Sequence, residues 1–278
     1  MSDATILVAK GEGVATITLN APQRLNAIDS DMGALLDKAL VETGTDPEVR
    51  VIVITGAGRG FCAGASMDRL AQVREQGLGK TPGAADADAF AAMPEAPPQL
   101  RTRYLIPLAI PKPVIAAVNG AAAGAGFVLT LACDIRMAAA SAKFVASFAA
   151  RGLVAESACA YLLPRIAGMS LASDMLFSAR AVQAEEALRA SLVSAVEPDE
   201  RFLARVNDYA RAMARTSSPG SLRTIKRQLQ RGLQSDLLTS IDESLAALRE
   251  AIKQPDFTEA LQAYSEKRDP KFAPLDRP

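Results

Sequence analysis

Apolar and polar residues alternate with a period of two near the start of the chain and form short continuous runs further on. The alternation in Thr5–Val8 and Val14–Leu19, on either side of Lys10–Gly13, predicts a β-hairpin with glycine in its turn. Val51–Ile54 and Val114–Val118 are apolar throughout, as is typical of strands buried on both faces. These segments predict a sheet in the first half of the chain.

Helical spacing of apolar residues dominates the later segments. Asp29 or Ser30 can cap a first helix. The apolar face of that helix is expected to contain Met32, Leu35, Leu36 and Leu40. The other segments with helical patterns are Phe127–Ala132, Ala158–Ile166, Leu171–Phe177, Ala184–Ala190, Arg201–Ala214, Leu222–Leu233, Leu237–Ile252 and Thr258–Glu266.

The distribution of these patterns divides the chain coarsely. Strands and helices mix over residues 1–195, which we expect to form an α/β core, and residues 196–278 are nearly all helical. Ala71–Pro98 differs from both flanks, because it is rich in Ala, Gly and Pro with scattered acidic residues. This composition predicts a mobile loop or lid.

Composition narrows the chemistry. The 278 residues carry 31 Lys+Arg and 31 Asp+Glu, so the formal net charge is zero, which disfavours a general nucleic-acid binder. Histidine is absent, which excludes Ser-His-Asp and Cys-His mechanisms and any His-ligated metal. Acid-base chemistry must therefore use Asp, Glu, Lys, Tyr or Cys.

The cysteines and the longest uncharged segment indicate where in the cell the protein is expected to be. Cys62, Cys133 and Cys159 form no CxxC pair, so we expect reduced, buried thiols, no metal site and a cytoplasmic protein. Pro113–Cys133 is uncharged and long enough to span a bilayer, but it is interrupted by glycines and Asn119. We interpret it as a buried strand running into a buried helix, and we expect no secretory signal and no membrane contact.

Two glycine-rich turns follow the predicted buried strands. The first is Thr55-Gly-Ala-Gly-Arg-Gly-Phe-Cys-Ala-Gly-Ala65, and the second is Asn119-Gly-Ala-Ala-Ala-Gly-Ala-Gly126. Neither has the glycine spacing of a dinucleotide-binding fingerprint. Such turns can present backbone N–H groups to a ligand, or they can simply allow tight packing between strand and helix. Spacing alone leaves both interpretations open.

Several motifs in the chain resemble the enoyl-CoA hydratase/isomerase (crotonase) superfamily in order and spacing. They are Asn20–Ile28, Ile54–Ala65, Lys112–Gly120 with Cys133-Asp-Ile135, Leu162–Gly168 and Glu266-Lys-Arg268. The resemblance implies an α/β, crotonase-like spiral of ββα turns with a helical C-terminal trimerisation region. It also implies an acyl-CoA thioester as substrate, a homotrimer or dimer of trimers, and no cofactor beyond the CoA of the substrate.

The resemblance implies roles for individual residues. The peptide N–H groups that hold the thioester oxygen in the family fall on Ala65 and Ala125. Positions that line the CoA and acyl sites fall on Arg24, Ala63, Met67, Val128, Phe148, Tyr264 and Lys267. Asp68, just past the first turn, is expected to be a helix-capping residue.

The carboxylates decide which reaction is expected. By the resemblance, the two glutamates of a hydratase would stand at Val128 and Phe148, and both are missing. Glu156 matches the acid of one subgroup of Δ3,Δ2-enoyl-CoA isomerases. An isomerase needs only one base, and an apolar wall from Leu153, Val154 and Ala155 would raise the pKa of that base. An alternative role for Glu156 is to favour the start of a helix.

The sequence therefore predicts an enoyl-CoA isomerase with Glu156 as its only acid-base group. Two alternatives stay open at this point. One is an enoyl-CoA hydratase or lyase with nonstandard catalytic residues. The other is a CoA-binding protein without activity that kept the fold and lost two carboxylates.

Overall fold

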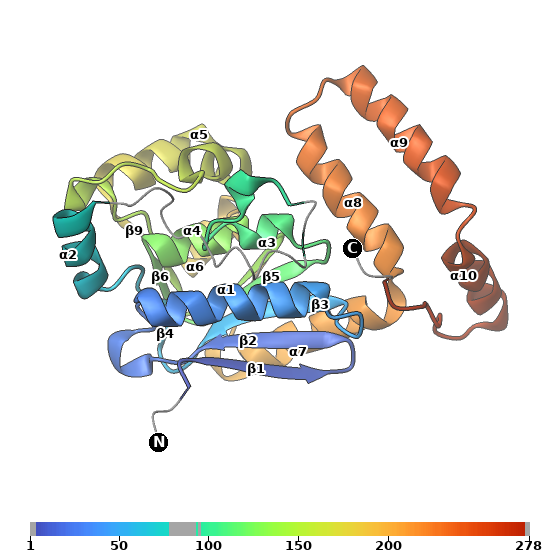
Figure 1. The fold of residues 1–278 in the computed structure, drawn as a ribbon, viewed down its shortest axis with the longest axis horizontal. Helices are drawn as coiled ribbons and strands as arrows, with labels where there is room; N and C mark the ends of the chain where they lie inside the picture. Colours follow the sequence, from blue (N-terminus) through green and yellow to red (C-terminus); the bar gives the residue numbers. More distant parts are fainter. Residues whose placement is uncertain (1–3, 78–92, 94–95, 276–278) are drawn as a thin grey trace.

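The structure is a computed structural model that describes residues 4–77, 93 and 96–275. Its larger sheet has the strand order β1-β2-β3-β5-β7-β10 (Figure 1). The bounds are β1 Ile6–Gly11, β2 Val14–Leu19, β3 Val51–Gly56, β5 Val114–Val118, β7 Ile135–Ala139 and β10 Ala195–Glu197. The β1–β2 hairpin is antiparallel, and the other neighbours are parallel. β3 and β5 are buried at every position, as predicted.

A second sheet has the order β4-β6-β8-β9. The bounds are β4 Gly60–Cys62, β6 Ala121–Ala123, β8 Lys143–Val145 and β9 Ala181–Gln183. β3, β5 and β7 of the larger sheet are each followed by a three-residue strand of this one and then by a helix. This repeat is the expected spiral of ββα turns, and it places the ends of β4, β6 and β8 side by side.

The predicted helices are present with three differences, and α3 is a short helix that the sequence pattern did not predict. Their bounds are α1 Ser30–Thr45, α2 Met67–Gln76, α3 Ile106–Ala109, α4 Ala125–Ala132, α5 Cys159–Ser178, α6 Ala184–Arg189, α7 Asp199–Thr216, α8 Pro219–Gly232, α9 Leu237–Ala251 and α10 Pro255–Glu266. First, Leu35 is 45% exposed, so placing it on the buried face of α1 was wrong, although Met32, Leu36 and Leu40 are buried. Second, α5 is one element with a break at Gly168, where two helices were predicted.

The third difference concerns the expected loop Ala71–Pro98. Its first six residues belong to α2, so the loop begins later than predicted. Pro98 starts a short 3-10 turn, Pro98–Leu100. Residues 78–92 and 94–95, where the expected lid would fall, lie outside the described residues.

The core has a layer on each face of the larger sheet. On one face, Phe202 and Val206 of α7 pack against Val53 and Ile115. On the other face, α1 and α4 pack into a larger cluster with Ile52, Ile54 and Phe61 among its members. Residues 199–266 are mostly helical, and α9 and α10 lie beyond α8, away from the core, in Figure 1.

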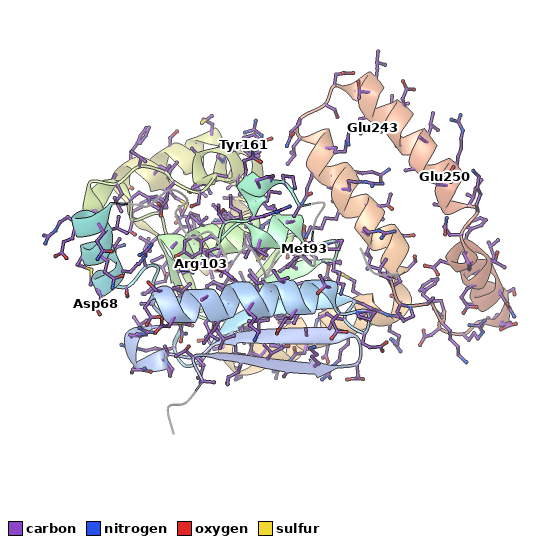
Figure 2. The ribbon with its side chains drawn as sticks, in the orientation of Figure 1. Asp68, Met93, Arg103, Tyr161, Glu243 and Glu250 are labelled. Atoms are coloured by element: carbon purple, nitrogen blue, oxygen red, sulfur yellow. The ribbon has the colours of Figure 1, made fainter. Side chains whose placement is uncertain are left out.

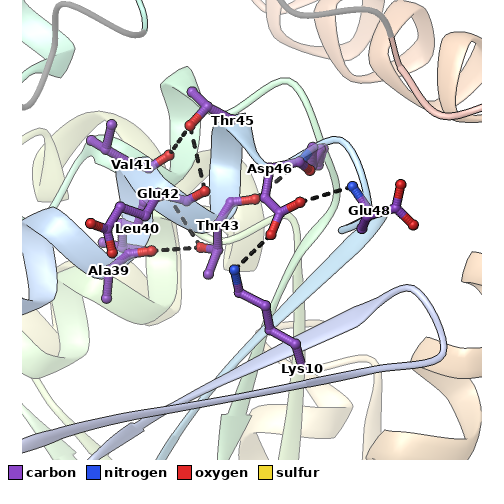
Figure 3. A network of polar contacts seen from close by, with 10 residues as sticks. Lys10, Ala39, Leu40, Val41, Glu42, Thr43, Thr45, Asp46 and Glu48 are labelled. Carbon is purple, nitrogen blue, oxygen red and sulfur yellow. Dashed lines mark hydrogen bonds and ion pairs between the residues drawn. The ribbon is translucent and has the colours of Figure 1, made fainter.

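Three lysines, exposed Lys10 and buried Lys112 and Lys226, connect these parts of the fold. At the C-terminal end of α1, Lys10 Nζ donates to Asp46 Oδ2 at 2.6 Å (Figure 3), and Lys112 Nζ donates to the carbonyl oxygens of Thr43 and Asp46. Lys226 of α8 donates to Asp134 Oδ2 at 2.7 Å and to the Lys112 carbonyl at 3.0 Å. Because the Lys226 side chain is only 7% exposed, these bonds hold α8 against the core from inside. Among the described residues, no helix is long and apolar enough to cross a membrane.

Candidate active site

Three parallel strands of the second sheet end next to one another. β4 leads into Ala63–Ser66, β6 into Gly124–Gly126 and β8 into Ala146–Phe148. Ligands of α/β proteins bind outside the carboxyl ends of parallel strands, because the loops there converge. The two glycine-rich turns predicted from the sequence both lie at this edge.

The first two of these turns are in direct contact. Gly64 has φ +98°, and a Cβ added there would stand 2.8 Å from the Ala123 carbonyl oxygen and 3.3 Å from the Ala125 nitrogen. A Cβ on Gly126 would stand 2.3 Å from the Cys62 carbonyl oxygen. Glycine is therefore required at both positions for the backbones to approach this closely.

Each turn carries a peptide N–H group without a protein acceptor among the described residues. Ile28 forms an isolated bridge with Ala65, in which Ile28 N donates to Gly64 O and Ser66 N donates to Ile28 O. This pattern turns the Ala65 N–H away from Ile28. Ala125 is the first residue of α4, where an N–H has no partner inside the helix. Both groups are free to donate to a ligand.

Glu156 lies in the loop before α5, and the backbone there is strained. Ser157 and Ala158 have φ values of 49° and 61°, a left-handed conformation that is uncommon outside glycine. The Glu156 residue is exposed in the single chain, yet partial desolvation of its carboxyl raises its pKa. No hydrogen bond or ion pair holds this carboxyl among the described residues.

The apolar wall expected beside Glu156 is wrong in part. Leu153 and Val154 are 45% and 79% exposed, so they do not enclose the carboxyl within one chain. Ala155 is partly buried and packs against the larger core cluster. The charge of Glu156 also acts on Tyr104 and Cys159. Burial, and to a smaller degree the charge of Glu156, raises the pKa of both groups.

Tyr104 is a residue that the sequence did not single out. It packs against the larger core cluster, and the charge of Glu156 adds to the effect of burial in raising its pKa. Tyr104 therefore keeps its proton at neutral pH. No local pattern could have identified it, because its neighbours come from distant parts of the chain.

Arg103, which precedes Tyr104 in the chain, forms an ion pair with Asp37 that is largely shielded from solvent. Arg103 Nε donates to Asp37 Oδ2 at 3.1 Å, and the two side chains are 12% and 2% exposed. Burial outweighs the nearby guanidinium and raises the pKa of Asp37 to about 7. The guanidinium lies over Gly33 of α1, where a Cβ would stand 2.2 Å from Arg103 Cζ (Figure 2). The pair fixes the backbone next to Tyr104 to α1.

The two positions expected for hydratase glutamates are buried and apolar. Val128 is 0% exposed and Phe148 is 4% exposed, and both belong to the larger core cluster. Phe127, which precedes Val128 in the chain, packs edge to face with Phe144. These side chains have no group that could activate water.

Three other expected binding residues, Arg24, Ala63 and Met67, lie around the first glycine-rich turn. Arg24 forms an ion pair with Asp29, and Ala63 N donates to the Leu25 carbonyl. Met67 begins α2 and is 73% exposed. Asp68 was expected to cap a helix, but the cap of α2 is Ser66, whose side chain accepts a hydrogen bond from Arg69 N. Asp68 lies in the first turn of α2 (Figure 2).

Tyr264 and Lys267 are not brought to this site within one chain. Both are exposed at the end of α10, and Tyr264 is 87% exposed. Figure 1 shows α10 on the opposite side of the molecule from α2.

The cysteines are free and buried, as predicted. Over the described part of the chain, no group of three or more His, Cys, Asp and Glu side chains could hold a metal ion.

Comparisons with known proteins agree on the family. A family model described as enoyl-CoA hydratase/isomerase matches residues 9–274. The chain is 35% identical to a 1,2-epoxyphenylacetyl-CoA isomerase of Escherichia coli, covering 94% of this chain and 95% of that one. It is 38% identical to a probable enoyl-CoA hydratase of Mycobacterium tuberculosis, covering 93% of this chain and 89% of that one.

Solved structures agree with the sequence relatives. An enoyl-CoA hydratase from Bacillus anthracis superposes with a TM-score of 0.84 at 29% identity, covering 97% of this chain and 99% of that one. An enoyl-CoA hydratase from Polaromonas gives 0.83 at 29% identity, covering 97% and 100%. The predicted crotonase-like α/β fold is thus confirmed. The chain belongs to the enoyl-CoA hydratase/isomerase family, whose enzymes act on acyl-CoA thioesters.

Proposed function

We propose that the protein moves the double bond of a 3-enoyl-CoA to the 2-position, with Glu156 as its single acid-base group. The observation that carries this proposal is the distribution of carboxylates around the turns. Glu156 has a raised pKa and no ion-pair partner among the described residues, whereas Val128 and Phe148 are apolar. One carboxylate suffices for a proton transfer within the substrate.

The mechanism uses the two free N–H groups. The Glu156 carboxylate takes a proton from C2 of the acyl chain, and the electron pair moves onto the thioester oxygen. The N–H groups of Ala65 and Ala125 donate to that oxygen and stabilise its negative charge. Loss of one such donor costs about 3–4 kcal/mol in other acyl-transfer enzymes. Protonated Glu156 then returns the proton at C4, so neither water nor a cofactor is consumed.

The environment of Glu156 supports this role. A raised pKa brings the proton affinity of the carboxyl closer to neutral pH, where proton transfer in both directions is efficient. Tyr104 is neutral at pH 7, as an ordinary phenol with a pKa of about 10 already is, and burial raises its pKa further. It therefore adds no second negative charge beside the enolate.

The relatives support two reactions. The 1,2-epoxyphenylacetyl-CoA isomerase supports an isomerase, in which acid-base chemistry occurs without net water addition. The probable enoyl-CoA hydratases favour a second candidate, hydration of a 2-enoyl-CoA with nonstandard residues in place of two glutamates. The alternative of a CoA-binding protein without activity predicts ligand binding and no turnover.

We also propose that the protein acts as a homotrimer or a dimer of trimers in the cytoplasm, without nucleic-acid or membrane partners and without a metal or redox cofactor. Exposed apolar side chains along α8, α9 and α10 support self-association. They are Ile225, Leu229, Leu233, Leu237, Leu238, Ile241, Leu245, Leu248, Ile252, Phe257 and Leu261. In such an assembly, Tyr264 and Lys267 would contact the CoA of a neighbouring subunit, while Arg24, Ala63 and Met67 would contact that of their own.

The test is an assay of the purified protein on matched 3-enoyl-CoA and 2-enoyl-CoA substrates in deuterated water, followed by mass spectrometry. Conversion of the 3-enoyl to the 2-enoyl thioester without water addition is expected. Addition of water to the 2-enoyl substrate alone would replace the proposal with hydration. Binding of both thioesters without turnover would favour the binding protein.

A further inference from the structure

A serine and an arginine lie together against the second glycine-rich turn. Arg151 Nη1 donates to Ser147 Oγ at 2.8 Å. A Cβ on Gly124 would stand 3.2 Å from Ser147 Oγ and 3.6 Å from Arg151 Nη1. Because Gly124 immediately precedes Ala125, the pair is adjacent to the peptide N–H that holds the thioester oxygen in the proposed function.

The pair offers hydrogen-bond donors and no free negative charge. The Ser147 hydroxyl accepts from Arg151, so its own proton is available to donate outward, and the residue is 9% exposed. Arg151 forms no ion pair with a carboxylate in the described ranges.

A ligand group that matches this set must accept hydrogen bonds and carry negative charge. A carboxylate does both, and an arginine can bind it through two parallel N–H groups. The other walls named for the acyl pocket, Val128 and Phe148, offer such a group nothing. Glu156 would repel it unless a cation stood nearby.

We propose that Ser147 and Arg151 recognise a carboxylate on the acyl chain, so that the preferred substrate is the CoA thioester of a dicarboxylic acid. The inference rests on the proposed function, because it takes the thioester oxygen to lie at the Ala125 N–H. The phosphates of CoA are a second source of negative charge. The length of the pantetheine arm separates them from the thioester, which places the acyl carboxylate nearer to Arg151.

The experiment compares the dissociation constants of two saturated thioesters of equal chain length, pentanoyl-CoA and glutaryl-CoA, and of free CoA. Saturated chains do not isomerise, so binding is measured apart from turnover. The variants are Arg151→Gln, Ser147→Ala and Arg151→Lys, each compared with wild type by calorimetry. Arg189→Gln, an exposed arginine at the end of α6, is the matched control.

We expect wild type to bind glutaryl-CoA more tightly than pentanoyl-CoA. Arg151→Gln should lower this preference by about 10- to 100-fold, the worth of a charge-assisted hydrogen bond, and Ser147→Ala by a few-fold. Arg151→Lys should restore part of it, because the charge remains and the paired N–H geometry is lost. Arg189→Gln should bind both thioesters as wild type does.

Three results would overturn the inference. If wild type binds glutaryl-CoA no more tightly than pentanoyl-CoA, the carboxylate site is refuted, while the proposed isomerase activity is not affected. Equal weakening of both thioesters in Arg151→Gln, with or without weakening of free CoA, would place the guanidinium at the thioester or at CoA itself. Failure of wild type to bind any of the three ligands would also remove the proposed function. Circular dichroism of each variant verifies that the fold is intact.

Discussion

Replacing Gly64 with alanine tests whether the contact between the two glycine-rich turns supports catalysis. The native φ of +98° lies outside the conformations that an alanine adopts readily. The new Cβ would also stand 2.8 Å from the Ala123 carbonyl oxygen and 3.3 Å from the Ala125 nitrogen. The first distance is too short to keep, so the end of β6 must move and take the Ala125 N–H with it.

Two separate costs follow from this geometry. The strained backbone should lower the free energy of unfolding by about 1–3 kcal/mol. Displacement of one N–H donor from the thioester oxygen should lower kcat by about 100- to 1,000-fold, as in other enzymes that lose such a donor. The catalytic loss therefore exceeds what partial unfolding of the sample would cause.

Gly168→Ala separates the two costs. Gly168 has φ +78°, but a Cβ there would meet nothing within 4 Å. This control carries a similar backbone strain far from the turns and should keep kcat within about threefold of wild type, while losing comparable stability. The assays are kcat for the 3-enoyl-CoA and denaturant unfolding. A folded Gly64→Ala variant with the kcat of wild type would refute the role of the contact.

Three further substitutions test other parts of the structure. Asp37, with its pKa raised from 3.8 to about 7, makes the wild-type free energy of unfolding fall as pH rises between those values, because the unfolded state loses the proton first. Asp37→Asn should remove this fall, on the order of 4 kcal/mol, in urea titrations from about pH 4 to about pH 8; equal slopes in both proteins would contradict it. Ala158→Gly should relieve the left-handed strain and raise the free energy of unfolding by up to about 1 kcal/mol, and a large loss would contradict it. Lys226→Met should destabilise the fold by about 3 kcal/mol, because Asp134 loses its partner; thermal unfolding like that of wild type would show that α8 does not need it.

Local signals were enough to predict the outline of the fold. The alternation around Lys10–Gly13 predicted the hairpin, and Asp29 caps α1 by accepting from Met32 N, as one of the two predicted caps. Leu35 was misplaced because helical spacing identifies an apolar stripe without fixing how much of it a neighbour covers. Only the packing of the folded chain decides that width.

The short strands of the second sheet could not be predicted in the same way. β4 Gly60–Cys62 and β6 Ala121–Ala123 have three residues each, too few to show alternation, and glycine and alanine have low strand propensity. They pair with neighbouring strands, and the tertiary packing of side chains such as Phe61 and Ala122 in the core holds them in place. Yet these strands bring the two turns together.

The candidate site was predictable where it depends on motif order and unpredictable where it depends on tertiary contact. Ala65, Ala125 and Glu156 were identified by family resemblance, and their roles stay predictions that the experiments above address. Tyr104 and Arg151 have no local signal, because their importance comes from neighbours at the ends of other strands and loops.

The central claim is that Glu156 alone moves the proton, and Glu156→Gln tests it most directly. The amide keeps the size of the side chain but cannot act as a base. We expect isomerisation of the 3-enoyl-CoA to fall by about 100- to 10,000-fold while the dissociation constant of CoA stays near that of wild type. Glu185→Gln, at an exposed position in α6, is the matched control. Full isomerase activity in Glu156→Gln would contradict the account.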